Sequence, residues 1–186
     1  MKQVEMNQNS RLTPHLALPS EAALSHLSEL NGLRLSPHFK LGELCKTKYV
    51  TADGNIPSRA VIENLIRVCG WLEELRARFN RLYSRSVECG VRSEEPIVIN
   101  SGYRSPEVNR LAGGAANSNH LTGCAVDIRC AGKEQMIRYA AILLDIADGT
   151  GKDYDELLLE QRGSVCWLHF AVRPKDNRHK ISFLKA

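Results

Sequence analysis

Apolar residues recur at helical spacing along two long segments of the chain. Over residues 58–84 they fall three or four positions apart, which predicts an amphipathic helix with one buried face. Residues 133–148 repeat this spacing and predict a second amphipathic helix. Trp71 lies within the first segment, and we expect its large side chain to belong to the core.

Short runs of β-branched and apolar residues predict strands between and after these helices. We expect four of them, near residues 96–100, 124–129, 156–160 and 166–173. The last two flank an Arg-Gly-Ser turn at 162–164, which predicts a hairpin. Helices combined with a small, mostly antiparallel sheet make an α+β fold.

The chain is long enough for one domain with a sizeable core. It has 186 residues, of which 43% are apolar and 25% are charged. Residues 1–34 are polar and lack sustained periodicity, apart from a short helix expected over 20–30. We therefore expect a poorly ordered or partly helical tail over 1–34 and a single domain over 35–186.

Charge and hydropathy exclude several classes of protein. The net charge is only +4, with both signs interspersed, so no nucleic-acid partner is expected, although an anionic wall polymer is compatible with it. No segment approaches ~18 unbroken apolar residues, so we expect no membrane insertion. The first residues are polar rather than basic and then apolar, which predicts synthesis in the cytoplasm without a signal peptide.

Six cysteines occur without any CxxC pair, which disfavours a thiolate metal cluster. They are Cys45, Cys69, Cys89, Cys124, Cys130 and Cys166. We expect most of them to be buried free thiols. Cys124 and Cys166 are expected to lie near the metal centre described next, where either one could add a thiolate.

Two histidines and one aspartate form the most informative pattern. His120 and Asp127 lie seven residues apart with Gly123 between them, where a tight turn could bring His120 back towards a strand that carries Asp127. His169 follows in the last predicted strand. Two imidazoles and one carboxylate leave a fourth zinc position open for water, which is the arrangement of a hydrolytic zinc site. The alternative is that His120 is a loop residue and Asp127 a surface carboxylate.

Arg104 lies at a predicted junction between a strand and a helix. The first strand ends near Asn100, Ser105 and Pro106 are typical of the first positions of a helix, and glycines at 113–114 would end it. A guanidinium in such a loop can bind a carboxylate through two parallel hydrogen bonds. A surface arginine or a structural salt bridge is the alternative.

These motifs, in this order, resemble one family. Residues 101–105 read Ser-Gly-Tyr-Arg-Ser, residues 118–127 contain Ser-x-His-x-x-Gly-x-Ala-x-Asp, and residues 167–169 read Trp-x-His. The order is similar to that of the zinc D-Ala-D-Ala carboxypeptidase family, which includes peptidoglycan endopeptidases and phage lysins. Residues 35–44 also resemble the opening segment of one branch, so the likeness covers roughly residues 35–180.

The resemblance implies a fold, a cofactor and roles for particular residues. The fold is the small α+β architecture shared with the hedgehog signalling domain, and the cofactor is Zn²⁺. The residues that match the zinc ligands are His120, Asp127 and His169. Arg104 matches the residue that holds a substrate carboxylate, Ser118 matches one that contacts substrate, and Tyr103 is expected to help orient it.

The general base departs from the usual pattern. Many members carry Glu three residues before the last histidine ligand, where this chain has Cys166. A thiol is a poor replacement for a carboxylate base. Glu160 ends the preceding strand, and the hairpin would place it beside the strand that carries His169, so we expect Glu160 to be the base.

The expected function is zinc-dependent hydrolysis of a peptide bond in peptidoglycan stem peptides, by a carboxypeptidase or endopeptidase. It would serve cell-wall remodelling or phage-type lysis, in the second case after release through a phage hole-former. We expect a monomer. The alternative is a binding module of the same fold that keeps the zinc and does no chemistry, an interpretation that Cys166 favours and that Arg104, Ser118 and Glu160 oppose.

Overall fold

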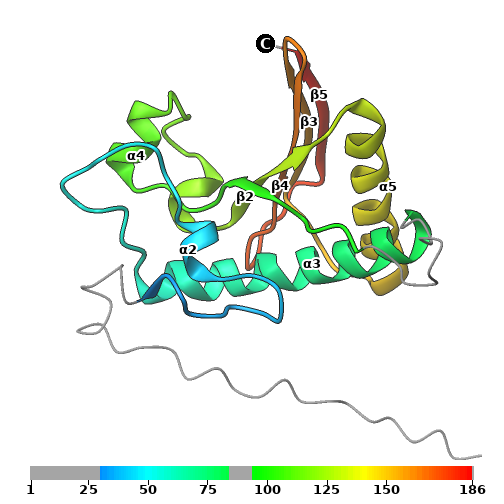
Figure 1. Cartoon of the computed structure of the whole chain (residues 1–186), viewed down its shortest axis with the longest axis horizontal. Helices are drawn as coiled ribbons and strands as arrows, with labels where there is room; N and C mark the ends of the chain where they lie inside the picture. The colour runs from blue at the N-terminus through cyan, green and yellow to red at the C-terminus, as the bar shows by residue number, and fades with distance from the viewer. Residues whose placement is uncertain (1–29, 84–93, 186) are drawn as a thin grey trace, which may run out of the picture.

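The computed structural model describes residues 30–83 and 94–185 (Figure 1). It has an α+β fold in which helices pack against a five-stranded sheet, as the sequence predicts. Nearly all of the helix expected over 20–30, and Cys89, lie outside the described residues. Leu30 is buried in the core, so packing begins ahead of residue 35, where we expected the domain to start.

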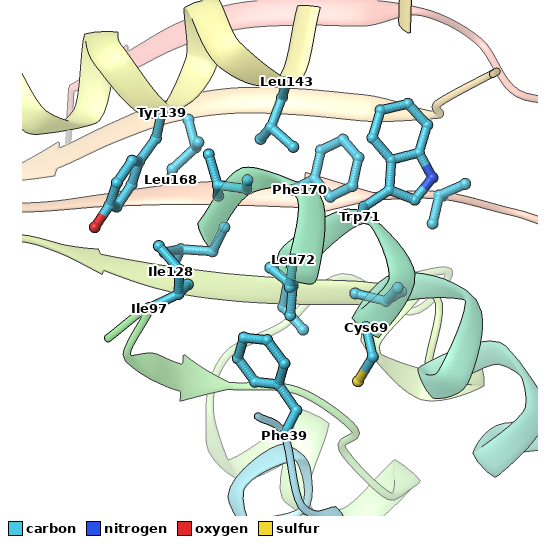
Figure 2. Close-up of a cluster of buried hydrophobic side chains, with 14 of the residues drawn as sticks. Phe39, Cys69, Trp71, Leu72, Ile97, Ile128, Tyr139, Leu143, Leu168 and Phe170 are labelled. Atoms are coloured by element: carbon cyan, nitrogen blue, oxygen red, sulfur yellow. The ribbon is translucent and has the colours of Figure 1, made fainter. Parts of the chain in front are cut away.

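The two long helices form where the apolar spacing predicts them. α3 spans Arg59–Tyr83 and α5 spans Lys133–Thr150. Both bury one face, and their buried side chains belong to one hydrophobic cluster together with residues of the sheet. Trp71 lies in this cluster, with its ring centroid 5.2 Å from that of Phe170 (Figure 2). The two helices therefore pack against the sheet through this shared cluster.

The sheet has the strand order β1-β2-β4-β3-β5. Its strands are β1 (Ile99–Ser101), β2 (Ala125–Cys130), β3 (Glu156–Arg162), β4 (Val165–Ala171) and β5 (Lys180–Lys185). Neighbouring strands are antiparallel except β3 and β5, which are parallel. The four expected strands and the β3–β4 hairpin are confirmed, with small shifts at their ends. β5 was not expected, because most of its side chains are exposed and backbone pairing to β3 holds it in place.

The register divides the sheet into two faces. Alternate residues of β2 and β4, such as Ile128 and Leu168, point into the cluster beneath α3 and α5 (Figure 2). The residues between them, including Asp127 and His169, point to the opposite face. In Figure 1, α5 lies on one side of strands β3 to β5, and α4 lies on the other. The second face is therefore free to carry a site.

The described part of the structure also contains three short helices. They are α2 (Leu41–Leu44), α4 (Pro106–Leu111) and the 3₁₀ helix η2 (Asn119–Thr122). The Ser105 side chain accepts a hydrogen bond from the backbone N–H of Val108, and Pro106 occupies the first turn of α4, as expected. Gly113 has a φ of 70°, which turns the chain away after α4.

Five of the cysteines are buried free thiols, as expected for most of the six. They are Cys45, Cys69, Cys124, Cys130 and Cys166. Among the helices in the described ranges, none combines the length and apolarity needed to cross a membrane.

A buried aspartate joins the start of β3 to the segment that leads into β5. Asp155 is fully buried and accepts two parallel bonds from Arg178, with Nε–Oδ1 at 2.9 Å and Nη2–Oδ2 at 2.7 Å. Arg173 Nε lies 3.1 Å from Oδ2, and Asn119 Nδ2 donates to the same oxygen at 2.7 Å. Burial alone would raise the pKa of Asp155, but these donors outweigh it and hold that pKa below its usual range.

We expect Asp155→Asn to lower the free energy of unfolding at pH 7 by about 2–3 kcal/mol. This is less than the loss for a fully buried pair, because Arg178 remains partly exposed. Since the folded-state pKa of Asp155 is lowered, its contribution is complete above about pH 4 and is lost as pH falls through the folded-state value. Urea unfolding of both proteins should show the difference at pH 7 and a smaller one below pH 4. Equal stability at pH 7 would contradict the assigned role.

Candidate metal centre

Strand pairing brings the first two candidate ligands together. Asp127 on β2 lies directly opposite His169 on β4, so both side chains project from the same face of the sheet. The His169 Nδ1 atom lies 2.9 Å from Asp127 Oδ1. Residues from separate predicted strands therefore form one pair, as the metal hypothesis requires.

A tight turn supplies the third candidate ligand. His120 lies in η2, where the Ser118 hydroxyl accepts a bond from the His120 N–H at 3.3 Å. Gly123 ends η2 with a φ of 70°, and an added Cβ there would lie 2.8 Å from the Val61 carbonyl oxygen. Only glycine fits this left-handed, crowded position without strain. The turn expected at Gly123 is confirmed, and it returns His120 to the sheet.

The contacts of His120 determine which ring nitrogen faces the cluster. His120 Nδ1 lies 2.6 Å from the carbonyl oxygen of Gly102. A carbonyl only accepts hydrogen bonds, so Nδ1 carries the proton and Nε2 is left with its lone pair. Nε2 lies 3.3 Å from Asp127 Oδ1. Its lone pair is therefore available to a cation on the Asp127 side of the ring.

The three residues form a group that could hold a metal ion. One ligand atom from each of His120, Asp127 and His169 lies within 4.8 Å of the others. Their exposed fractions are 2%, 8% and 7%, so the group is screened from bulk water. Two nitrogens and one oxygen suit zinc and leave a coordination position for a further ligand. The donor set and its convergence thus fit the cofactor expected from the sequence.

The charges within the group are strongly coupled. Burial would raise the pKa of Asp127, but His120 and His169 outweigh it and hold that pKa far below its usual range. Burial would lower the pKa of His169, but Asp127 and Glu156 raise it to about 9. Without a metal, a proton on His169 is therefore favoured, and a bound cation must displace it.

Glu156 lies beside the candidate centre, although its place was not expected from the sequence. Its Oε2 atom lies 3.5 Å from His169 Nε2 and accepts a bond from Asn119 Nδ2 at 2.9 Å. Contact with His169 lowers the pKa of Glu156 to about 2, so it faces the ring as a carboxylate. Glu156 and Asp127 therefore contact opposite nitrogens of His169. The signal available in the sequence was strand alternation, since Glu156 and Glu160 lie on the same face of β3.

Arg104 contacts a candidate ligand directly. Its Nη2 atom lies 2.5 Å from Asp127 Oδ2, and its Nε atom donates to the Ser101 hydroxyl at 2.8 Å. The Arg104 backbone N–H also donates to the His120 carbonyl at 3.1 Å. The salt bridge that the sequence left as an alternative is therefore present. It occupies Oδ2 of Asp127, while Oδ1 faces the two imidazoles.

Glu160 lies on the same face as the cluster, one row further along the sheet. It pairs with Trp167, while Leu158 pairs with His169, so Glu160 and His169 project from the same side. Burial and the charge of Asp127 raise the pKa of Glu160, while the charges of His169 and Arg104 act in the opposite direction. The hairpin thus places this carboxylate beside the candidate centre.

Three other residues of interest lie away from the ligand atoms. Ser118 caps the turn that carries His120, and Tyr103 packs in the hydrophobic cluster with only 8% of its surface exposed. Cys166 also belongs to that cluster, because a residue three positions from His169 in a strand points to the other face. The expectation that Cys166 lies near the metal is therefore wrong.

Cys124 takes no part in the cluster either. Its thiol donates weakly to the Thr122 carbonyl at 3.9 Å, and its own carbonyl accepts a bond from Val172 N–H. Within residues 30–83 and 94–185, the group that could hold a metal contains no sulfur ligand. The candidate centre is built from nitrogen and oxygen alone.

Comparison with known proteins gives one positive result. A family model described as peptidase M15 matches residues 37–151, which is more than half of the chain. The matched range includes Arg104, His120 and Asp127, and ends before β3 and β4. A search of curated proteins found no significant match. Together with the His-Asp-His cluster, the match shows that this chain belongs to the peptidase M15 family.

Proposed function

We propose that this chain is a zinc peptidase that hydrolyses a peptide bond in the stem peptides of peptidoglycan. Its membership of the M15 family supports metallopeptidase activity, and the wall substrate is our proposal. The observation that carries the proposal is the buried His120, Asp127 and His169 cluster with two functional groups beside it, the Arg104 guanidinium and the Glu160 carboxylate.

The orientation of the three side chains supports one choice of zinc-binding atoms. These are Nε2 of His120, Oδ1 of Asp127 and Nδ1 of His169, since the remaining ring nitrogens face Gly102 and Glu156. When bound, zinc would lower the pKa of a water molecule and polarise the scissile carbonyl. The protein's own part is to present these ligands in a buried, oriented set.

Glu160 would act as the general base and then as the acid. Its carboxylate takes a proton from the attacking water and delivers it to the leaving amine. The raised pKa of Glu160 suits this role, because a carboxylate of higher pKa accepts a proton more readily.

Arg104 would bind a substrate carboxylate with the part of its guanidinium that is still free. Its Nε and one Nη2 hydrogen are used by Ser101 and Asp127, and Nη1 makes no hydrogen bond to the described residues. The Nη1–Nη2 edge can therefore donate two parallel bonds. We propose that Ser118 and Tyr103 assist indirectly, by holding the His120 turn and the Arg104 loop.

The binding-module alternative rests on the missing carboxylate at position 166, and we propose that Glu160 supplies the base instead. Cys166 points into the core, so it does not stand in for a base beside the cluster. Peptidoglycan lies outside the cell membrane, and we propose action on the wall, in remodelling or in phage-type lysis through a membrane hole.

Replacing one ligand should remove the metal. We expect His169→Ala to lose stoichiometric zinc, because two remaining ligands make a weak site. His38→Ala is the matched control, since His38 pairs with Glu73 on the surface. Metal analysis of the purified proteins measures this, and far-UV circular dichroism checks the fold. Full zinc occupancy in His169→Ala would disprove the ligand assignment.

Replacing the base should separate metal binding from chemistry. We expect Glu160→Gln to keep zinc and lose about 10²- to 10⁴-fold in kcat, because an amide has the carboxylate's shape and does not accept the proton. Cys166→Ser should change turnover far less, since that side chain faces the core. Release of peptide from purified peptidoglycan measures both. Wild-type turnover in Glu160→Gln would rule out Glu160 as the base.

Arg104→Lys should impair binding of substrate although the charge is kept. An ammonium does not reproduce the two-bond geometry, so we expect KM to rise about 10- to 100-fold on a peptide with a free carboxylate. The variant should lose much less on the same peptide with that carboxylate amidated. Zinc content is measured alongside, because Arg104 also holds Asp127. An equal loss on both peptides would limit Arg104 to a structural role.

A further inference from the structure

A second feature adjoins the candidate centre on the Arg104 side. A cavity of about 490 Å³ lies between β1, β2, α4 and the segment that follows α2. Its charged lining residues are Lys46, Lys48, Arg104 and Arg129, and no carboxylate lines it. Four positive groups around one concave surface attract an anion and repel one another.

Three of these cations lack an acidic partner in the described parts of the chain. Lys46 and Arg129 form no ion pair there, and the Lys48 ammonium lies 5.2 Å from the centre of the Tyr49 ring. Other arginines do form ion pairs, as Arg178 does with Asp155. The charges of Lys46, Lys48 and Arg129 are therefore left without an ion pair among the described residues, whereas Arg104 pairs with Asp127.

The strand register connects this cavity to the reacting groups. Arg129 lies two residues after Asp127 on β2, on the same face of the sheet, and pairs with Trp167, which in turn pairs with Glu160. Arg129, Trp167 and Glu160 thus form a row next to the row that contains Asp127 and His169. A peptide lying across Trp167 would have Glu160 on one side and the basic cavity on the other.

We infer that this cavity binds a second carboxylate of the substrate, separate from the one on Arg104. The substrate class is therefore an anionic peptide with at least two carboxylates. This inference rests on the proposed function. A stem peptide meets the requirement when its D-glutamate keeps a free α-carboxylate in addition to the terminal one. The cations of the cavity then determine which form of the peptide is preferred.

The test pairs a charge-neutralising variant with two substrates. The variant is Lys46→Gln/Lys48→Gln/Arg129→Gln, and the substrates are a synthetic stem peptide with a free D-glutamate carboxylate and the same peptide amidated at that group. We expect kcat/KM of the variant to fall about 10- to 100-fold on the free acid, mostly through KM, and less than about twofold on the amide. Raising the salt concentration should weaken the wild-type preference for the acid.

Controls separate this inference from the proposed function. Lys133→Gln/Lys175→Gln removes exposed charges away from the cavity and should leave kcat/KM unchanged on both substrates. If the triple variant fails to fold or to bind zinc, Arg129→Gln alone is compared with the wild type on the same two peptides. Calorimetric binding of both peptides gives a readout that needs no turnover. If the variant selectively loses binding of the free acid while no protein hydrolyses either peptide, the cavity inference stands and the peptidase proposal is refuted. If the variant affects the acid and the amide equally, the cavity does not bind the second carboxylate.

Discussion

The pairing of β2 with β4 is the constraint on which the rest of the site depends. It places Asp127 opposite His169, and every other functional group is arranged around that pair. Asp127 Oδ1 faces two imidazoles, while Oδ2 is held by Arg104. Slipping the register by one residue would turn Asp127 into the core beneath α3 and α5. The apolar face of the same strands, packed by Ile128 and Leu168, makes such a slip unfavourable.

Polar contacts next to the cluster connect it to the residues at the start of β3. Asn119 contacts both Asp155 and Glu156, so the residue next to His120 also binds the acids at the start of β3. Glu156 faces the far nitrogen of His169 and leaves Nδ1 towards Asp127. Carboxylate contacts of this kind set the tautomer and direction of a metal-binding histidine. The arginines that satisfy Asp155 come from the segment leading to β5, which lies beyond the matched family range.

Much of this arrangement could be predicted from the sequence, because it depends on local patterns. The apolar spacing predicted α3 and α5, and the β-branched runs with the turn at Gly163 predicted the hairpin. The three candidate ligands followed from short motifs and a family resemblance. β5 was missed, since an exposed edge strand is stabilised by pairing that no local pattern reveals. The direction of Cys166 and the place of Glu156 did follow from alternation, but only once the register was known.

We propose that His120, Asp127 and His169 hold zinc while a further coordination position stays open to a reactant. X-ray absorption spectroscopy of the zinc-loaded protein tests it most directly, because nitrogen and oxygen scatterers differ from sulfur in distance and amplitude. We expect a shell of two imidazole nitrogens with oxygen ligands at about 2.0–2.2 Å and no sulfur. A sulfur ligand at about 2.3 Å, or a shell without two imidazoles, would contradict it.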